Sequence, residues 1–259
     1  MTGRRVVAAP DKFRGTATAA QVADAIATAA TAADWTCDRV PMADGGEGTL
    51  AVLGGANRHA TVTGPLGEPV EAGWRLHERT AVIEMAQASG LALIGDPADN
   101  DPIAADTVGT GELIHLAVES GARRVIVGMG GSATVDGGLG ALRAMHPHQR
   151  YRAIELEVAC DVRTSFLDAA EVFGPQKGAS AAQVRLLSNR LARLADVYEA
   201  DHEVDVRVLA GAGAAGGDDE RTAGRERHGD QSAVGRASDP VSGVAEVVRP
   251  VHDADVRAH

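Results

Sequence analysis

The sequence predicts an α/β fold that contains a parallel sheet, and three features of the 259-residue chain support this prediction. Short apolar runs alternate with segments of helical periodicity, which is the order of strand–helix–strand units. Acidic or glycine-rich turns follow several of these runs. The stretch from about residue 59 alternates in polarity and contains the turn formers GPLG, which favours antiparallel strands. We therefore expect one parallel region and one mixed region.

The first 64 residues read as a parallel unit. RRVVAAP, residues 4–10, is expected to be a short buried strand that ends at Pro10. A helix follows over residues 16–35, where Thr18 and Gln21 have the spacing of a capping box. Its expected apolar stripe is Val22, Ile26 and Ala29. A strand in CDRVPM and a helical LAVL complete this region.

The next region changes character at a domain boundary expected near Gly64. Antiparallel strands are predicted over residues 59–86. The helix TVGTGELIHLAVESGA then buries one apolar face and has Gly121 as a candidate C-terminal cap. The remaining expected elements are a strand at 123–129, a helix at 138–145, a strand at 153–162 and a long amphipathic helix at 180–200.

The composition excludes several classes of protein. The net charge of −11 argues against nucleic acid or an anionic membrane as the main partner. The two cysteines, Cys37 and Cys160, are far apart and form no CxxC pair, which favours a reducing compartment and no zinc site. The sequence contains no signal-peptide pattern and no apolar run of membrane-spanning length. We expect a soluble, cytoplasmic protein.

GMGGSATVDGG, residues 128–138, places five glycines between a predicted strand and a predicted helix. Such a turn exposes consecutive backbone N–H groups that can bind phosphate, and Ser132 and Thr134 add hydroxyl donors. The stretch is neither a Walker A motif nor a GxGxxG fingerprint, so a plain tight turn is an equal alternative. Asp136 disfavours an anion site unless it holds a metal or orients a substrate hydroxyl.

Two charged turns follow the first two strands. APDKFRGT contributes Asp11, Lys12 and Arg14, which suit a substrate that carries both a hydroxyl proton and phosphate charge; a solvated loop is the alternative. ADGGEGT contributes Asp44 and Glu47, which suit Mg²⁺ coordination or proton abstraction. An Asp-Gly turn with Glu47 near a helix N-terminus is an equally good interpretation of this second motif.

Two further candidates occur later in the chain. Asp161 ends a predicted strand, and Lys177 lies between glycines in FGPQKGA, where it either reaches a phosphate or is an exposed loop lysine. Joint placement decides between the alternatives, because most candidates follow predicted strands, whose carboxyl ends line the ligand crevice of an open α/β sheet. An acidic, glycine-rich set with a few cations fits phosphoryl transfer from a magnesium nucleotide, and the sequence has no GxSxG for acyl transfer.

Nine motifs in order resemble the bacterial glycerate kinase family. They are APDKFRGT, VPMADGGEGT, VTGPLGEPVEA, AVIEMAQASGL, TVGTGELI, GMGGSATVDGG, EVACDV, VFGPQKGA and LAGAGAAGG, and they span Val6 to Gly217. The resemblance implies phosphorylation of D-glycerate at its 2- or 3-hydroxyl, with ATP and Mg²⁺. It also implies a Rossmann-like parallel-sheet domain interrupted by a second α/β domain with a mixed sheet. Residues 1–64 would form the N-terminal part of the first domain, and residues 65–217 the inserted one.

The resemblance and the loops together imply the site. The expected catalytic residues are Asp44, Asp161 and Lys12, and the expected substrate-binding residues are Asp11, Arg14, Glu47 and Asp136. The expected nucleotide-binding residues are Gly130, Gly131, Ser132, Thr134 and Lys177, with Asp44 and Glu47 as metal ligands. The expected partners are D-glycerate and the nucleotide, and a second copy in a homodimer. The family usually has lysine at the position of Arg14, which keeps the charge but changes its geometry.

The chain departs from the family pattern after Gly217. Residues 218–259 contain six arginines but no Leu, Ile, Met, Phe, Tyr or Trp, so we predict that this segment is disordered. Its composition resembles translation in a shifted frame, and the first domain would then lack several strands. The alternatives to a glycerate kinase are a catalytically inactive remnant of one and a kinase of a related small hydroxy acid.

Overall fold

The computed structural model describes residues 4–13 and 16–214. The segment 218–259, for which we predict disorder, lies outside this range. The strands are β1 (Arg5–Ala8), β2 (Thr36–Arg39), β3 (Arg58–Thr63), β4 (Pro69–His77), β5 (Thr80–Glu84), β6 (Arg124–Gly128) and β7 (Glu155–Ala159). The helices are α1 (Ala19–Ala32), α2 (Thr49–Val52), α3 (Ala86–Ser89), α4 (Val108–Glu119), α5 (Leu139–Ala144), α6 (Ala169–Phe173) and α7 (Ala181–His202). The α/β class is confirmed.

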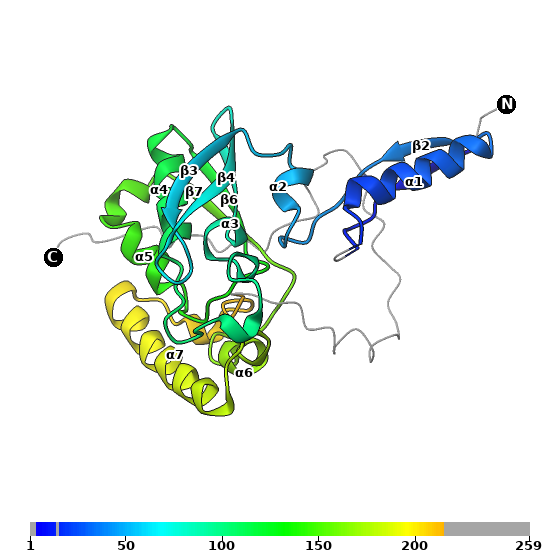
Figure 1. The fold of residues 1–259 in the computed structure, drawn as a ribbon. Coiled ribbons are helices and arrows are strands. Elements are labelled where there is room, and N and C mark those ends of the chain that lie inside the picture. Colours follow the sequence, from blue (N-terminus) through cyan, green and yellow to red (C-terminus); the bar gives the residue numbers. More distant parts are fainter. Residues whose placement is uncertain (1–3, 14–15, 215–259) are drawn as a thin grey trace.

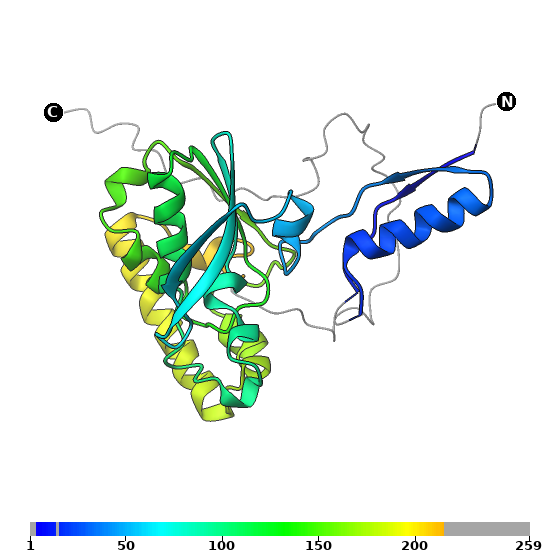
Figure 2. The same ribbon diagram turned by 45° about the horizontal axis from the view of Figure 1, so that its top comes forward.

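The first unit is a parallel pair, β1 and β2, joined by α1. It extends away from the rest of the molecule in both views (Figures 1 and 2). The predicted capping box is confirmed, since Thr18 and Gln21 bond each other's backbone N–H groups at the start of α1. Figure 1 shows that the long connection after β2 carries α2 and leads into the larger sheet.

Two details of the first unit differ from the predictions. The buried face of α1 is formed by alanines at positions 19, 23 and 27, whereas Ile26 is 37% exposed. A strip of small side chains lets the helix lie close to a narrow two-stranded sheet, so the larger residues remain outside. The prediction that β1 is buried holds only for Ala8, which is 2% exposed, whereas Val7 is 59% exposed. A two-stranded sheet covered by one helix has a face that no other described element covers.

The second unit is a five-stranded sheet with the order β3-β4-β5-β6-β7. The first three strands are antiparallel, and β5, β6 and β7 are parallel, so the mixed sheet is confirmed. β3 lies within this sheet although it precedes Gly64. We therefore place the start of the second domain between α2 and β3. The parallel part has its carboxyl ends at Glu84, Gly128 and Ala159.

Two apolar cores support this sheet and the segment that follows it. One core lies between the sheet and α4, with Ile83, Leu113 and Val125 at its centre. α4 ends as predicted, with Gly121 in the left-handed conformation at φ +98°. The second core lies between α6 and α7 and includes Val135 from the glycine-rich loop. The loop 128–138 is therefore anchored to both cores.

A charged pair joins β6 to β7. Arg124 donates to both carboxylate oxygens of Glu157, over 2.7 and 2.8 Å, and these bonds raise the pKa of Arg124. The Glu157 side chain is 7% exposed and that of Arg124 is 37% exposed. We expect Arg124→Met to lower the free energy of unfolding by about 1–3 kcal/mol, because it leaves the Glu157 carboxylate buried and unpaired. The loss is limited because the arginine of the pair is partly exposed to solvent, which weakens the interaction.

Urea unfolding at pH 7 measures this effect. The double variant Arg124→Met, Glu157→Met is expected to recover part of the loss, since it buries no unpaired charge. Equal stability of Arg124→Met and the unmodified chain would show that the pair adds nothing.

Candidate active site

Lys12 and Asp44 form an ion pair where the two units meet. The Nζ of Lys12 lies 3.3 Å from Oδ1 of Asp44, and their side chains are 15% and 27% exposed. The same oxygen accepts a 2.8 Å bond from the Gly46 N–H, and Asp11 accepts from the Lys12 N–H at 2.6 Å. Partial burial alone would raise the pKa of Asp44, but the Gly46 amide and the Lys12 ammonium outweigh it and hold that pKa below its ordinary value. Asp44 is therefore ionised at neutral pH.

The Asp44 turn packs directly on the carboxyl ends of β6 and β7. The Gly130 N–H donates to the Gly45 carbonyl over 3.0 Å, and the Met129 N–H donates to the Ala159 carbonyl over the same distance. A Cβ added at Gly45 would lie 2.3 Å from the Ala159 oxygen, and one at Gly128 would lie 2.6 Å from the Gly45 oxygen. Backbone meets backbone here, so the acidic turn and the glycine-rich loop form one body.

This close contact predicts that any side chain at position 130 destabilises the protein. A Cβ there would lie 2.4 Å from the Gly46 Cα, a backbone atom that cannot rotate away. We expect Gly130→Ala to push the two loops apart and to cost about 1–3 kcal/mol of unfolding free energy, as overpacking does. Gly73→Ala is the control, because its nearest neighbour is the Ala56 side chain at 3.2 Å. Thermal unfolding should show the larger decrease in Tm for Gly130→Ala; an equal decrease would contradict the close packing.

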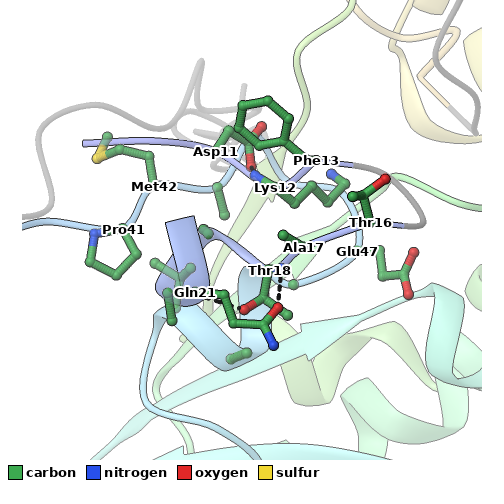
Figure 3. A pocket seen from close by; sticks show the side chains of 16 residues that line it. Asp11, Lys12, Phe13, Thr16, Ala17, Thr18, Gln21, Pro41, Met42 and Glu47 are labelled. Atoms are coloured by element: carbon green, nitrogen blue, oxygen red, sulfur yellow. Dashed lines mark hydrogen bonds between the residues drawn. The ribbon is translucent and has the colours of Figure 1, made fainter. Parts of the chain in front are cut away.

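A pocket of about 460 Å³ opens beside the ion pair. Asp11, Lys12 and Phe13 lie along one side of it, and Thr18 and Gln21 at the start of α1 lie across from them (Figure 3). Glu47 lines it as well and is exposed. The remaining lining residues are Thr16, Ala17, Ala19, Ala20, Pro41, Met42, Ala43, Gly48, Ala51 and Val52. The pocket thus combines charged groups with an apolar wall.

The glycine-rich loop is held by pairing with the segment after α3. The Leu91 N–H donates to the Gly131 carbonyl and the Ala133 N–H donates to the Ser89 carbonyl, both over 2.9 Å. Gly131 is exposed and has φ +76°, a conformation that favours glycine. Ser132 and Thr134, by contrast, are 2% and 0% exposed. The hydroxyl groups of the loop therefore point into the protein, and Gly131 is on its surface.

Lys177 lies under this loop and is buried, with an exposed fraction of 1%, so the alternative of an exposed loop lysine was wrong. Its Nζ donates to the Ser132 hydroxyl over 2.8 Å and to the Thr134 carbonyl over 2.5 Å. Desolvation lowers the pKa of Lys177 to about 7, although the negative charge of Asp136 opposes the shift. Lys177 therefore supports the loop from inside. These contacts explain the presence of a lysine at this position without a direct contact to a nucleotide.

Asp136 is also an internal residue. Its Oδ2 accepts bonds from the N–H and the hydroxyl of Thr107 and from the Gly140 N–H, over 2.7–3.0 Å. Its Oδ1 accepts from the Gly138 N–H over 3.0 Å. Asp136 is 2% exposed, and its four bonds fix the starts of α4 and α5 against the loop. The geometry favours a structural role for Asp136 over the predicted contact with substrate.

The structure describes one of the two remaining predicted site residues. Asp161 is exposed and follows the end of β7 by two residues. A Cβ added at Gly45 would lie 3.0 Å from the backbone nitrogen of the neighbouring Cys160, so Asp161 is close in sequence to the point where the acidic turn packs. Arg14 lies outside the described residues.

Sequence reasoning missed two residues that hold the loops. Glu84, at the end of β5, is 4% exposed and accepts bonds from the N–H groups of Gly48 and Leu50. Asn100 donates to the carbonyls of Ala133 and Lys177. A signal for Glu84 was present, because it is a single carboxylate in the apolar run TAVIEM. Asn100 has no comparable signal, since it lies in the polar stretch GDPADND.

The fold and the site define a class: an α/β protein in which a charged βαβ unit and a glycine-rich loop meet at the carboxyl ends of parallel strands. A sequence model of the Glycerate kinase family matches residues 6–148 and 145–218. The chain belongs to the glycerate kinase family.

Individual relatives agree with this assignment. The chain is 41% identical to a glycerate 2-kinase of Escherichia coli K12 and 40% identical to a glycerate kinase of Bacillus subtilis 168. Each alignment covers 82% of this chain and 66% of the relative. A solved crystal structure, described as a candidate glycerate kinase 2 from Salmonella typhimurium LT2, is 37% identical with a TM-score of 0.71, over 83% of this chain and 67% of that one.

The chain therefore spans just under two thirds of the length of the curated relatives that it matches. Within the part that the structure describes, no helix is both long enough and apolar enough to cross a membrane.

Proposed function

We propose that this chain transfers the γ-phosphoryl group of ATP to a hydroxyl of D-glycerate, at the 2- or the 3-position. The observation that carries the proposal is the Lys12–Asp44 pair, which lies beside a pocket of about 460 Å³ and against the turn at Gly130. A cation, an ionised carboxylate and a glycine-rich turn are groups that phosphoryl-transfer sites commonly use. Family membership supports the choice of substrate class.

Each group has a role in this scheme. The carboxylate of glycerate binds the ammonium of Lys12, and Arg14 is a second candidate cation. Asp44, ionised at neutral pH, accepts the proton of the attacking hydroxyl through its carboxylate. Asp161 is the alternative acceptor, and Asp11 and Glu47 bind the remaining hydroxyl. Asp44 is favoured over Asp161 because the Gly46 amide and Lys12 fix its position.

The phosphate groups would lie against the glycine-rich turn. The Gly130 N–H already donates to Gly45, so Gly131, which is exposed and left-handed, is the turn residue best placed to approach a phosphate. Ser132 and Thr134 contribute by shaping the turn from below, through their contacts with Lys177.

The donor set fits Mg²⁺ bound together with the nucleotide. Mg²⁺ commonly takes one or two protein carboxylates and completes its shell with phosphate oxygens and water. Asp44 and Glu47, which flank Gly45 and Gly46 in the sequence, supply that number of carboxylates; where Asp44 holds the ion, Asp161 is the proton acceptor. When bound, the ion would neutralise charge that develops on the transferred phosphoryl group.

Release of ADP from the 259-residue chain tests the proposal. ATP, MgCl₂ and D-glycerate are expected to give ADP at a rate well above the rate without glycerate, and ³¹P NMR of the product separates 2-phosphoglycerate from 3-phosphoglycerate. L-glycerate, glycolate and lactate form the substrate panel, and faster turnover of one of these would favour a kinase of a related hydroxy acid. Nucleotide binding without ADP release from any of them would favour an inactive remnant.

Assembly and location are separate proposals. We expect a cytoplasmic homodimer, and sedimentation velocity of the purified chain measures the oligomeric state.

A further inference from the structure

Glu84 connects the acidic turn to the five-stranded sheet. It is the last residue of β5, where it pairs with Gly128 of β6, and it is 4% exposed. Its Oε1 accepts the Gly48 N–H over 2.9 Å and the Leu50 N–H over 2.6 Å. A carboxylate this buried must be hydrogen-bonded to be tolerated, and here its partners are backbone groups more than 30 residues earlier in the chain.

The bonded amides belong to the start of α2, which has no side-chain cap of its own. Gly48 is left-handed at φ +98°, so this segment is shaped by its backbone. The first N–H groups of a helix are usually bonded by a local Ser, Thr or Asp side chain. Here Glu84, at the end of β5, supplies the acceptor instead.

The start of α2 is in turn bonded to the Asp44 turn. The Thr49 hydroxyl donates to the Gly46 carbonyl over 2.7 Å, and the Gly46 N–H donates to Asp44. A continuous chain of bonds therefore runs from the end of β5 through α2 to the carboxylate of Asp44. The bond from the Gly130 N–H to the Gly45 carbonyl also holds the Asp44 turn, through the glycine-rich loop.

We propose that Glu84 is a positioning residue that sets the Asp44 carboxylate against the glycine-rich turn. The inference rests on the proposed function for its effect on turnover, but its structural part stands independently. Glu84 acts through the Gly48 and Leu50 amides and does not need to touch a substrate.

Two substitutions at Glu84 separate positioning from mere folding. Glu84→Gln keeps a carbonyl oxygen that can accept both N–H groups, whereas Glu84→Ala removes the acceptor. Glu112→Ala is the matched control, because Glu112 likewise accepts a backbone N–H, that of Thr63 over 2.7 Å, but on the α4 side of the sheet. Hydrogen–deuterium exchange of the segment 44–52 is measured in the full chain, together with kcat and KM for glycerate.

Glu84→Ala is expected to speed exchange of 44–52 by at least about tenfold and to lower kcat by at least about tenfold with little change in KM. Glu84→Gln should restore both, and Glu112→Ala should leave the exchange of 44–52 unchanged. Unchanged exchange in Glu84→Ala would overturn the inference, as would an equal increase in Glu112→Ala. A Glu84→Gln variant with native exchange and the low kcat of Glu84→Ala would overturn it as well, since the charge itself would then be required.

The exchange measurement keeps the two hypotheses distinguishable. If the unmodified chain releases no ADP, the proposed function fails, while faster exchange in Glu84→Ala still supports the positioning role. If ADP is released but exchange does not respond to Glu84→Ala, the positioning role fails alone.

Discussion

Replacing Asp44 by asparagine is expected to lower kcat for glycerate by at least about 100-fold, because a positioned general base contributes about 10²–10⁴ to the rate. Asn has the same shape and its Oδ1 can still accept the Gly46 N–H, so the turn should keep its geometry. What is lost is the negative charge that faces Lys12 and would receive the hydroxyl proton.

Steady-state ADP release and thermal unfolding measure the two consequences. Asp24→Asn is the matched control, because Asp24 also pairs with a cation, Arg39, but on the exposed side of α1. It should leave kcat unchanged. Asp161→Ala tests the alternative acceptor: a large loss in Asp161→Ala and near-normal turnover in Asp44→Asn would reverse their roles. Near-normal turnover in both variants would refute this site.

The second large effect is expected at Lys177 and depends on pH. In the folded chain burial lowers the pKa of Lys177 to about 7, whereas an unfolded lysine titrates near 10.4. Between these values the unfolded chain binds the extra proton, so the contribution of Lys177 to stability rises as pH increases from 7 to 10. The neutral amine keeps its bonds to Ser132 and Thr134 without the cost of a buried charge.

Lys177→Met fills similar space but removes these bonds. We expect it to lower the unfolding free energy by about 1–3 kcal/mol at pH 10, where two buried acceptors lose their donor, and to leave it unchanged or raise it at pH 7, where the buried lysine carries its charge for part of the time. The measurement is the difference in unfolding free energy between the unmodified chain and Lys177→Met in guanidinium chloride at several pH values. Because other titrating groups are common to both proteins, they largely cancel in the difference. A difference that shrinks as pH rises would contradict the buried, hydrogen-bonded lysine.

The sequence predicted the elements well because their signals are local. The capping box at Thr18, the alternation before Glu84 and the periodicity of α4 each occur within a few residues. It also placed the acidic turn and the glycine-rich loop at strand ends, and these two segments are in contact.

The features that could not be predicted from the sequence depend on contacts between residues far apart along the chain. The burial of Lys177 follows from bonds to residues more than 40 positions earlier, and the four bonds of Asp136 come mainly from Thr107 and α5. Periodicity does not encode such contacts, so both residues looked like ligands for a substrate. The exposed strand β1 shows the same limitation, because an apolar run signals burial only where another element covers it.

The Gly45–Gly130 contact also determines where the molecule can bend. Upstream of it, the Met42 N–H still donates to the Pro10 carbonyl, so residues up to 42 belong to the βαβ unit. From Gly45 onward the backbone is fixed to the large sheet. Among the described residues, Ala43 and Asp44 lie between these two anchored segments, so we expect any hinge between the units to be there. Lys12 would swing with one unit while the Asp44 turn stays with the other, so opening and closing of the molecule would break and remake the 3.3 Å ion pair.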